Sequence, residues 1–360
     1  MSCSFGSKFK ITVFGQSHSD CIGVVIDGVP AGLHPDMDAI SAFLRRRAPG
    51  QGAHTTARKE TDTPQILSGV ADGVTCGAPL CAVIQNENRR SGDYDALKNL
   101  PRPGHADFTA FEKFDGYADT RGGGNFSGRM TAPLCFAGAI AKQILAKSGI
   151  TIGAHISRLA KIDDAPFDPV GIDAKTFKQI AEKDFPVISD DVKDAMLAAI
   201  AAAKADGDSV GGVIECAAVG VPVGWGEPIF DSAESVIAHL AFGIPAVKGI
   251  EFGSGFAAAD ARGSTNNDPM AAGPAFRTNN AGGILGGISR GDDIVFRVAV
   301  KPVPSIYLRQ ETITTENEEC SIEIEGRHDV CLCPRIVPVV EAMTALTLAD
   351  LYLRNRSARS

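Results

Sequence analysis

The chain has 360 residues, and 35 Lys and Arg against 43 Asp and Glu give it a formal net charge of −8. Nucleic-acid-binding domains are usually basic, so this balance disfavours a nucleic-acid binder, although it does not exclude a small anionic ligand in a locally basic pocket. Hydrophobic residues make up 44%, and no apolar run approaches the roughly 18 residues of a membrane span. The 39 glycines are clustered, which points to loops rather than to disorder.

The nine cysteines are spread along the chain, with no Cys-x-x-Cys and no His/Cys cluster at the spacing of zinc ligands. We therefore predict reduced thiols and no metal site, as in a cytosolic protein. The segment from Met1 to Phe14 carries two lysines but no apolar stretch typical of an export signal, so we expect a cytoplasmic protein.

In the first half of the chain, runs rich in Val and Ile predict strands at Phe9–Phe14, Cys21–Asp27 and Leu80–Gln85. Apolar residues at helical spacing predict one helix from Met37 to Arg47, stopped by Pro49-Gly50, and another from Leu134 to Leu145, closed by Gly149. Residues 49–64 and 86–124 show no clear period, and long irregular segments in a compact domain are usually functional loops.

In the second half, strands are predicted at Ile150–Ile156, Gly211–Val219 and Ile294–Val300. Helices are predicted after an N-cap at Ser189, after an N-cap at Asp231 through Leu240, and from Pro338 to about Leu353. The strands come in groups rather than in β-α-β alternation, which favours an α+β fold. Each half holds strands, a glycine cluster and a helix, which hints at an internal duplication.

Two motifs have the residue types that bind anions. Arg45-Arg46-Arg47 suits the C-terminal end of a helix as a solvated basic cluster, but it also opens an irregular loop, and guanidinium groups hold phosphates and carboxylates. The run Gly122-Gly123-Gly124-Asn125-Phe126-Ser127-Gly128-Arg129 precedes a predicted helix, where backbone N–H groups can approach a phosphate. It is not a Walker motif, and alone it is more often a plain turn.

Two histidines lie in loops beside glycines. His18 follows the first strand in Gly15-Gln16-Ser17-His18, and His105 lies in a turn between Arg102 and Asp107. A lone histidine is more often structural, but imidazole titrates near neutral pH, so two in such loops favour an acid–base role. The other histidines have no comparable context.

Together these motifs resemble the chorismate synthase family along nearly the whole chain, from Phe14 to Leu353. The resemblance is carried by nine motifs in family order: Gly-x-Ser-His (15–18), three arginines followed by Pro-Gly (45–50), Arg-Pro-Gly-His-Ala-Asp (102–107), Gly-Gly-Gly-x-x-Ser-x-Arg (122–129), Gly-Asp-Ser-x-Gly-Gly (207–212), Ala-Val-Lys-Gly-x-Glu-Phe-Gly (246–253), Asn-x-Ala-Gly-Gly-Ile-Leu-Gly-Gly-Ile-Ser (279–289), Lys-Pro-x-x-Ser (301–305) and Gly-Arg-His-Asp (326–329). One such motif is weak, but nine in order are highly specific.

The resemblance implies an enzyme that converts 5-enolpyruvylshikimate 3-phosphate to chorismate, the last common step of the shikimate pathway. This carbon–oxygen lyase reaction is a 1,4-elimination of phosphate that requires reduced FMN without net redox change, and NADPH is the implied reductant in some members. The implied fold is a sandwich of two four-stranded antiparallel sheets enclosing helices, with pseudo-symmetric halves. Residues 1–360 are then one domain, and the implied assembly is a homotetramer.

The resemblance also implies roles for individual residues. His18 donates a proton to the departing phosphate, His105 protonates or stabilises reduced flavin, and Asp329 helps a flavin nitrogen to accept the substrate proton. Ser17 and Ser127 orient these groups. The implied cofactor-binding positions are Arg47 (in the nucleotide or substrate pocket), Asn125, Phe126, Ser127, Pro245, Ala246, Gly286, Lys301, Pro302, Val303, Pro304, Ser305 and Arg327. Ala53 and Asn125 depart from the family pattern, which commonly has arginine there, and Pro245 replaces a usual asparagine.

Two other functions compete with this one. A phosphotransferase is disfavoured, because the chain has no Walker-type lysine motif and no clear pattern of magnesium ligands. The alternative kept open is a flavin-binding protein, or an NAD(P)H-dependent flavin reductase, without elimination activity. Against simple binding, two loop histidines and an aspartate lie among the anion-binding motifs.

Overall fold

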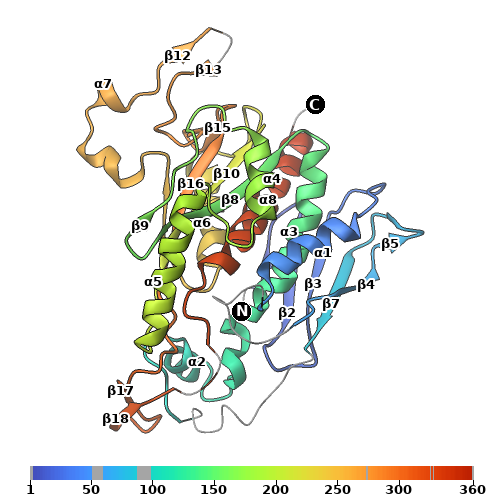
Figure 1. Ribbon diagram of the computed structural model, residues 1–360. Helices are drawn as coiled ribbons and strands as arrows, with labels where there is room; N and C mark the ends of the chain where they lie inside the picture. The colour runs from blue at the N-terminus through green and yellow to red at the C-terminus, as the bar shows by residue number, and fades with distance from the viewer. Residues whose placement is uncertain are drawn as a thin grey trace.

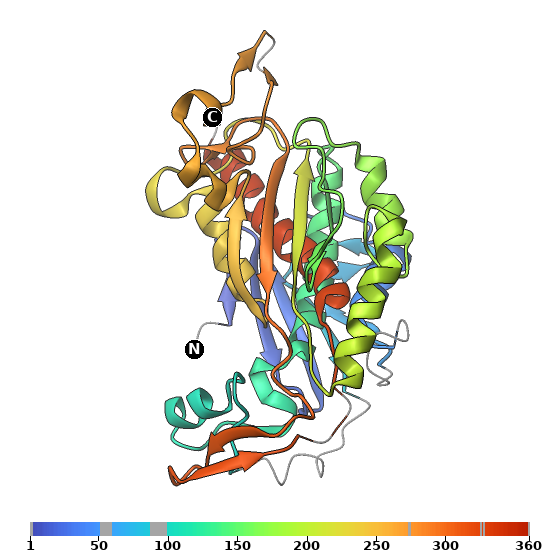
Figure 2. The same ribbon diagram turned by 60° about the vertical axis from the view of Figure 1, so that its left-hand side comes forward.

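Two antiparallel β-sheets enclose a layer of helices in the computed structural model (Figures 1 and 2). The structure describes residues 3–50, 60–86, 99–272, 275–324, 326 and 328–358. The fold is α+β with the helices between the sheets, as the sequence analysis predicts.

The first sheet comes from the N-terminal half of the chain. Its strand order is β1-β2-β3-β7-β4, made of β1 (Ser4–Phe5), β2 (Lys10–Gly15), β3 (Cys21–Asp27), β7 (Leu80–Gln85) and β4 (Pro64–Ser68). In its centre β3 pairs with β7 from Cys21 opposite Gln85 to Ile26 opposite Leu80. A small hairpin of β5 (Val70–Ala71) and β6 (Val74–Thr75) lies between β4 and β7 in the chain.

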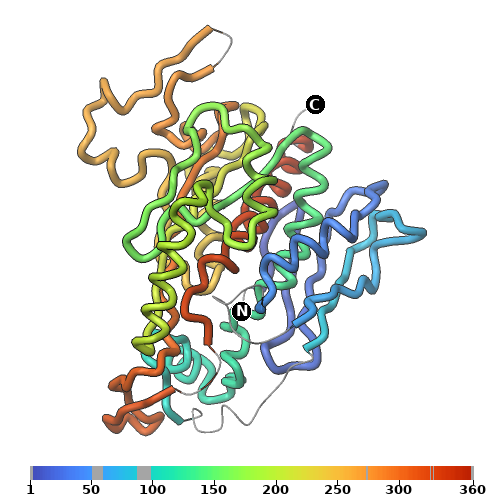
Figure 3. The backbone as a smooth tube through the Cα atoms, viewed as in Figure 1, coloured from blue at the N-terminus to red at the C-terminus, as the bar shows by residue number. Residues whose placement is uncertain are grey.

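The second sheet comes from the C-terminal half. Its order is β11-β16-β10-β8-β9, made of β11 (Val247–Phe252), β16 (Ile294–Val300), β10 (Gly212–Val219), β8 (Thr151–Leu159) and β9 (Ile162–Asp163). Three two-stranded ribbons accompany it: β12 (Met270–Ala271) with β13 (Ala275–Phe276), β14 (Ile284–Leu285) with β15 (Ile288–Ser289), and β17 (Gln310–Ile313) with β18 (Glu319–Ile322). The segment that contains α7 (Gly263–Asn266), β12 and β13 extends away from the sandwich (Figure 3).

The two halves share one topology. Each sheet has four longer strands, which lie in the order first, second, fourth, third of the chain, and a two-residue strand at one edge. The predicted four-stranded sheets are therefore present, each with a short fifth strand. Helices α1 (Met37–Arg47) and α6 (Ala233–Phe242) follow the second strands, and α3 (Thr131–Ala146) and α8 (Cys333–Ala358) follow the fourth. This repeated order agrees with the predicted pseudo-symmetric halves.

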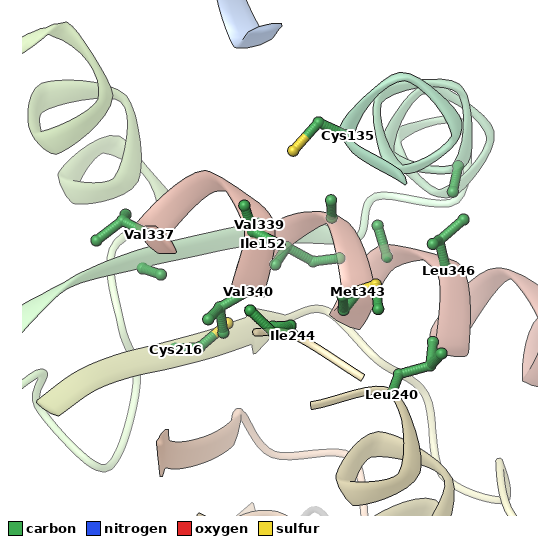
Figure 4. Packing of buried hydrophobic residues seen from close by; sticks show 14 of the residues in the cluster. Cys135, Ile152, Cys216, Leu240, Ile244, Val337, Val339, Val340, Met343 and Leu346 are labelled. Atoms are coloured by element: carbon green, nitrogen blue, oxygen red, sulfur yellow. The ribbon is translucent and has the colours of Figure 1, made fainter. Parts of the chain in front are cut away.

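Helices α3 and α8 form the centre of the core, because both are buried along most of their length. Val340 and Met343 of α8 lie among Cys216 of β10, Ile152 of β8 and neighbouring apolar side chains (Figure 4). Helix α8 is long and apolar enough to cross a membrane by composition, but 89% of its most apolar window is buried inside the protein, as in a core helix.

The remaining helices lie outside this layer or in connections. Helix α4 packs on β8 and covers the outer face of the second sheet with Phe177 and Ile180. The other helical segments are α2 (Asp107–Lys113), η2 (Arg121–Phe126), η3 (Gly128–Met130), α4 (Ala174–Glu182), η4 (Asp190–Val192), α5 (Lys193–Ala205), η5 (Ile229–Asp231), η6 (Gly255–Asp260) and α7 (Gly263–Asn266).

All six predicted strands are present, and all nine cysteines are free thiols. Three helix starts differ from the prediction. Ser232, not Asp231, caps α6, because its hydroxyl accepts from the Ser235 amide. Ser189 precedes η4 without a side-chain cap, so α5 itself begins at Lys193. Helix α8 begins at Cys333, so Pro338 lies within it rather than at its start.

Candidate active site

A cavity of about 690 Å³ opens where loops from both halves meet. It is lined by the loop after β2, the end of α1, the turn before α2, the glycine run of η2, the start of β11, the segment after β16 and the start of α8. Thirteen of the predicted site residues line it: Ser17, Arg47, His105, Asn125, Phe126, Ser127, Pro245, Ala246, Lys301, Val303, Pro304, Ser305 and Asp329. The structure therefore brings together motifs that are up to about 300 residues apart in the sequence.

Three described residues of the predicted site are not on this lining. His18 is buried directly behind it, and Pro302 lies between two lining residues. Gly286 lies in the turn between β14 and β15, at the opposite end of the molecule from α2 (Figure 1). The predicted cofactor-binding residue Arg327 and the departure Ala53 lie outside the described residues. The catalytic role of His18 and the cofactor-binding roles of Pro302, Gly286 and Arg327 stay predictions.

The glycine run passes between the two predicted catalytic histidines. Its three glycines have φ values of 60°, 87° and 52°, a left-handed backbone that side chains rarely adopt. A Cβ on Gly122 would lie 2.4 Å from Cε1 of His18, and one on Gly123 would lie 3.2 Å from Cε1 of His105. Glycine is needed here because the backbone packs directly against both imidazole rings.

His105 is held on one side by a carboxylate and an arginine. Its Nδ1 lies 2.6 Å from Oδ1 of Asp107. Arg102 donates from Nε to Oδ2 of Asp107 at 2.7 Å and from Nη2 to Oδ1 at 2.9 Å. Burial alone would raise the pKa of Asp107, but the hydrogen bonds from Arg102 and His105 outweigh it and hold that pKa well below its usual range.

His18 reaches the cavity through a neighbouring hydroxyl. Its side chain is buried, and its Nδ1 lies 3.2 Å from Oγ of Ser17, which lines the cavity. The Ser17 amide donates to the carbonyl of Gly124 at 3.2 Å, which ties this loop to the glycine run. The contact places an ionisable ring one hydroxyl away from whatever occupies the cavity.

Arg47 belongs to a buried ion-pair network. Its guanidinium donates to Asp62, to the Thr131 hydroxyl at 3.0 Å and to the Gly128 carbonyl at 3.1 Å. Asp62 also accepts from Arg129, which pairs with Glu60 at 2.8 Å. Burial opposes ionisation of Asp62, but the two arginines outweigh it and lower its pKa.

A second pair holds Asp329 at the N-terminal end of α8. Arg335 donates to Oδ2 of Asp329 and, through Nε, to the carbonyl of Arg47 at 3.1 Å.

Lys301, after β16, donates to the carbonyl of Gly104. Partial burial, together with Lys248 on β11, lowers the pKa of Lys301. The like charges of Lys248 and Lys301 lie on one wall of the cavity, and an anion bound there is stabilised by both.

The described lining carries six cationic side chains and two carboxylates, although the whole chain is acidic. The cations are Arg47, Arg102, Arg129, Lys248, Lys301 and Arg335, and the carboxylates are Glu60 and Asp329. Four of the cations pair with carboxylates, Arg47 and Arg129 with Asp62, Arg102 with Asp107 and Arg335 with Asp329. The six cations still exceed Asp62, Asp107, Asp329 and Glu60 by two positive charges, so a cavity of this size can hold organic anions that carry phosphate or carboxylate groups.

Sequence reasoning missed Asp62, Arg335 and Lys248 as parts of this site. Asp62 lies in a stretch without periodicity, and its two arginine partners are 15 and 67 residues away. The pair of Arg335 with Asp329 could have been suggested from sequence, because Arg335 lies one helical turn after Leu332 and close to Asp329 in the chain. A buried arginine requires a carboxylate partner, and Asp329 is such a partner.

Comparison with known proteins agrees with the motifs. The family model described as chorismate synthase matches residues 9–353. Proteins named chorismate synthase are 48% identical in Dehalococcoides mccartyi, over 98% of this chain and 97% of that protein, and 47% identical in Porphyromonas gingivalis, over 99% and 97%. A solved structure described as "Crystal Structure of Chorismate Synthase" matches with a TM-score of 0.76 and 26% identity, over 98% of this chain and 93% of the other. Matches that span nearly the whole chain show that it belongs to the chorismate synthase family.

Proposed function

We propose that this chain is an enzyme that converts 5-enolpyruvylshikimate 3-phosphate to chorismate by 1,4-elimination of phosphate. Family membership along residues 9–353 supports the reaction. The observation that carries it is the cavity itself, which joins His105, Asp329 and the Ser17–His18 pair to six cationic side chains. A phosphorylated dicarboxylate needs that charge, and a proton transfer needs those titratable groups.

The cavity also fits reduced FMN as the cofactor. Its volume of about 690 Å³ lies within the range of ligand pockets, about 300–1,000 Å³. Lys301, Ser305 and the exposed Asn125 supply donors on one wall, and Phe126 supplies an aromatic surface. When bound, reduced FMN supplies electron density to the elimination without net oxidation.

In this proposal the elimination breaks one C–H bond and the C–O bond to phosphate, and the residues divide the two proton movements. His18 supplies the proton to the departing phosphate through Ser17, whose hydroxyl contacts its Nδ1. Asp329, which accepts a hydrogen bond from Arg335, helps a flavin nitrogen to accept the substrate proton. His105 protonates or stabilises the reduced cofactor, and Ser127 orients the ligands from the end of the glycine run.

The test is anaerobic turnover with reduced FMN, followed as chorismate absorbance and free phosphate. His105→Ala and His18→Ala should lose most turnover while still binding FMN, and His34→Ala, at an exposed position, should keep it. Absence of chorismate from the unmodified enzyme would favour the binding or reductase alternative. Near-normal turnover in both histidine variants would overturn the assigned roles.

The assembly and cellular context are part of the same proposal. We expect a cytoplasmic homotetramer. We also expect the whole chain to be one domain, because α3 of the first half and α8 of the second form one shared core. Turnover driven by NADPH under strict anaerobiosis, without dithionite, would show that the enzyme reduces its own flavin. Sedimentation would measure the assembly state directly.

A further inference from the structure

The turn before α2 and the first residue of α2 hold an Arg102–Asp107–His105 cluster that is largely buried. The exposed fractions of the side chains are 6% for Arg102, 12% for Asp107 and 18% for His105. Asp107 accepts from the Arg102 backbone amide at 3.0 Å, in addition to the two guanidinium bonds. Arg102 therefore holds the carboxylate of Asp107 in one orientation, independently of its contact with His105.

An ionised carboxylate can only accept hydrogen bonds. The 2.6 Å contact between Oδ1 of Asp107 and Nδ1 of His105 therefore requires the proton on Nδ1. In neutral His105 this leaves a lone pair on Nε2. Nη2 of Arg102 lies 3.2 Å from Nδ1 and 3.4 Å from Nε2, so it does not distinguish the two nitrogens, and the tautomer is set by the contact with Asp107.

Nε2 is also the ring nitrogen closest to Gly123 in the glycine run. A Cβ on Gly123 would lie 3.3 Å from it, so only the absence of a side chain at Gly123 leaves this side of the ring open. Both His105 and Ser127, which flanks Gly123, line the cavity.

We propose that Asp107, clamped by Arg102, is a positioning residue that fixes His105 with its proton on Nδ1, so that Nε2 is the atom that takes up and releases protons in the cavity. The inference deepens the proposed function and rests on it for the catalytic role of His105. It differs from that proposal in naming a residue, an atom and a tautomer.

The neighbours of His105 show what a substitution at Asp107 would change. Replacing Asp107 with asparagine removes the only carboxylate in contact with the ring among the described residues. An asparagine side chain can donate as well as accept, so it does not require the proton of His105 on Nδ1.

The first experiment needs no variant and no turnover. Nitrogen-15 NMR of histidine-labelled enzyme distinguishes protonated from unprotonated ring nitrogens, and the His105 signals are assigned by their loss in His105→Gln. We expect neutral His105 to carry its proton on Nδ1. A neutral His105 with its proton on Nε2 overturns the inference, whether or not the enzyme forms chorismate.

The second experiment compares Asp107→Asn with Asp107→Glu in the anaerobic assay. Asp107→Asn should lower kcat by about 10- to 100-fold with little change in KM or FMN binding, because an amide does not fix the proton of His105 on Nδ1. Asp107→Glu keeps the carboxylate and should recover part of kcat. Asp163→Asn, which breaks an exposed Arg–Asp pair at β9, is the matched control and should leave kcat and KM unchanged.

The two experiments separate failure of this inference from failure of the proposed function. If the unmodified enzyme forms no chorismate, the proposed function fails, and the tautomer measurement still decides the role of Asp107. If turnover of the unmodified enzyme is normal and Asp107→Asn keeps the same kcat, the proposed function stands and the positioning role is wrong. If Asp107→Asn does not fold, the inference is tested by kcat of Asp107→Glu and by the nitrogen-15 NMR measurement of the His105 tautomer in the unmodified enzyme.

Discussion

Gly138 of α3 packs directly on Ala342 of α8, at the point where the two halves of the chain meet. A Cβ on Gly138 would lie 2.4 Å from the Cβ of Ala342 and 3.0 Å from its carbonyl oxygen. Such distances are far below van der Waals contact, so the helices approach this closely only because position 138 has no side chain.

We therefore expect Gly138→Ala to destabilise the protein, although alanine favours helices. The inserted methyl must push the two central helices apart, which typically costs about 1–3 kcal/mol. Urea unfolding can be followed by fluorescence of Trp225, the single tryptophan, which is buried. Gly263→Ala, where a Cβ meets open space, is the control. Equal stability of the two variants would contradict this close packing.

A second prediction concerns Glu341, a buried carboxylate between α1, α3 and α8. It contacts Arg46 at 2.6 Å and Lys142 at 2.5 Å. Burial opposes its ionisation, but the two cations outweigh this and lower its pKa from 4.5 to about 2. Glu341→Gln leaves two partly buried cations without their carboxylate partner and should cost about 1.5–3 kcal/mol in the free energy of unfolding.

The pH dependence has a definite sign. Because the folded pKa of Glu341 is depressed, its contribution is present above pH 4.5 and is lost as the pH falls toward 2. Urea unfolding over this range should show a smaller acid-induced loss in Glu341→Gln than in the unmodified protein. Glu182→Gln, in an exposed pair with Lys178, should follow the unmodified protein. Parallel curves for all three would contradict the prediction.

The strands and the loop histidines could be predicted from sequence because their signals are local. Val- and Ile-rich runs such as Cys21–Asp27 and Ile294–Val300 show buried strands within seven residues. The edge strand β11, Val247–Phe252, was not predicted as a strand, because it is only partly buried and contains Gly249. The arrangement in two four-stranded sheets came from the family resemblance and not from periodicity, and the order of strands within each sheet was not predicted.

The charge network could not be predicted, because its signal exists only in three dimensions. Arg47 appeared as one of three basic residues at a helix end, a pattern that a solvated cluster shares. The structure instead buries Arg47 beside Asp62, while Arg46 turns to Glu341, 295 residues away. Which of three adjacent arginines faces the cavity depends on the rotation of α1 against the other central helices.

A third prediction concerns His155, which is fully buried between two carboxylates on the second sheet. Its Nδ1 lies 3.0 Å from Asp164 and its Nε2 lies 3.0 Å from Glu215, so both nitrogens donate and the ring is an imidazolium. Burial would lower its pKa, but the two carboxylates outweigh burial and raise it above 6.5.

Because the folded pKa of His155 is raised, its contribution to stability is complete below pH 6.5 and is lost as the pH rises through the folded value. The free energy of unfolding should therefore fall on the alkaline side in the unmodified protein. His155→Gln should be less stable at neutral pH and should lack this fall. His34→Gln, at an exposed position, should behave like the unmodified protein, and a fall that persists in His155→Gln would assign it to another group.

The last prediction separates the positioning role of the glycine run from its backbone strain. Gly122 and Gly73 both have positive φ, 60° and 77°, so alanine at either position should cost about 1–2 kcal/mol in stability. A Cβ on Gly122 also meets His18 at 2.4 Å and Oγ of Ser17 at 2.6 Å, whereas one on Gly73 meets nothing within 4 Å. Gly122→Ala should therefore lower kcat as His18→Ala does, while Gly73→Ala keeps kcat. Equal kcat in the two glycine variants, at similar stability, would mean that the Ser17–His18 pair tolerates displacement and that its place behind Gly122 is not required for turnover.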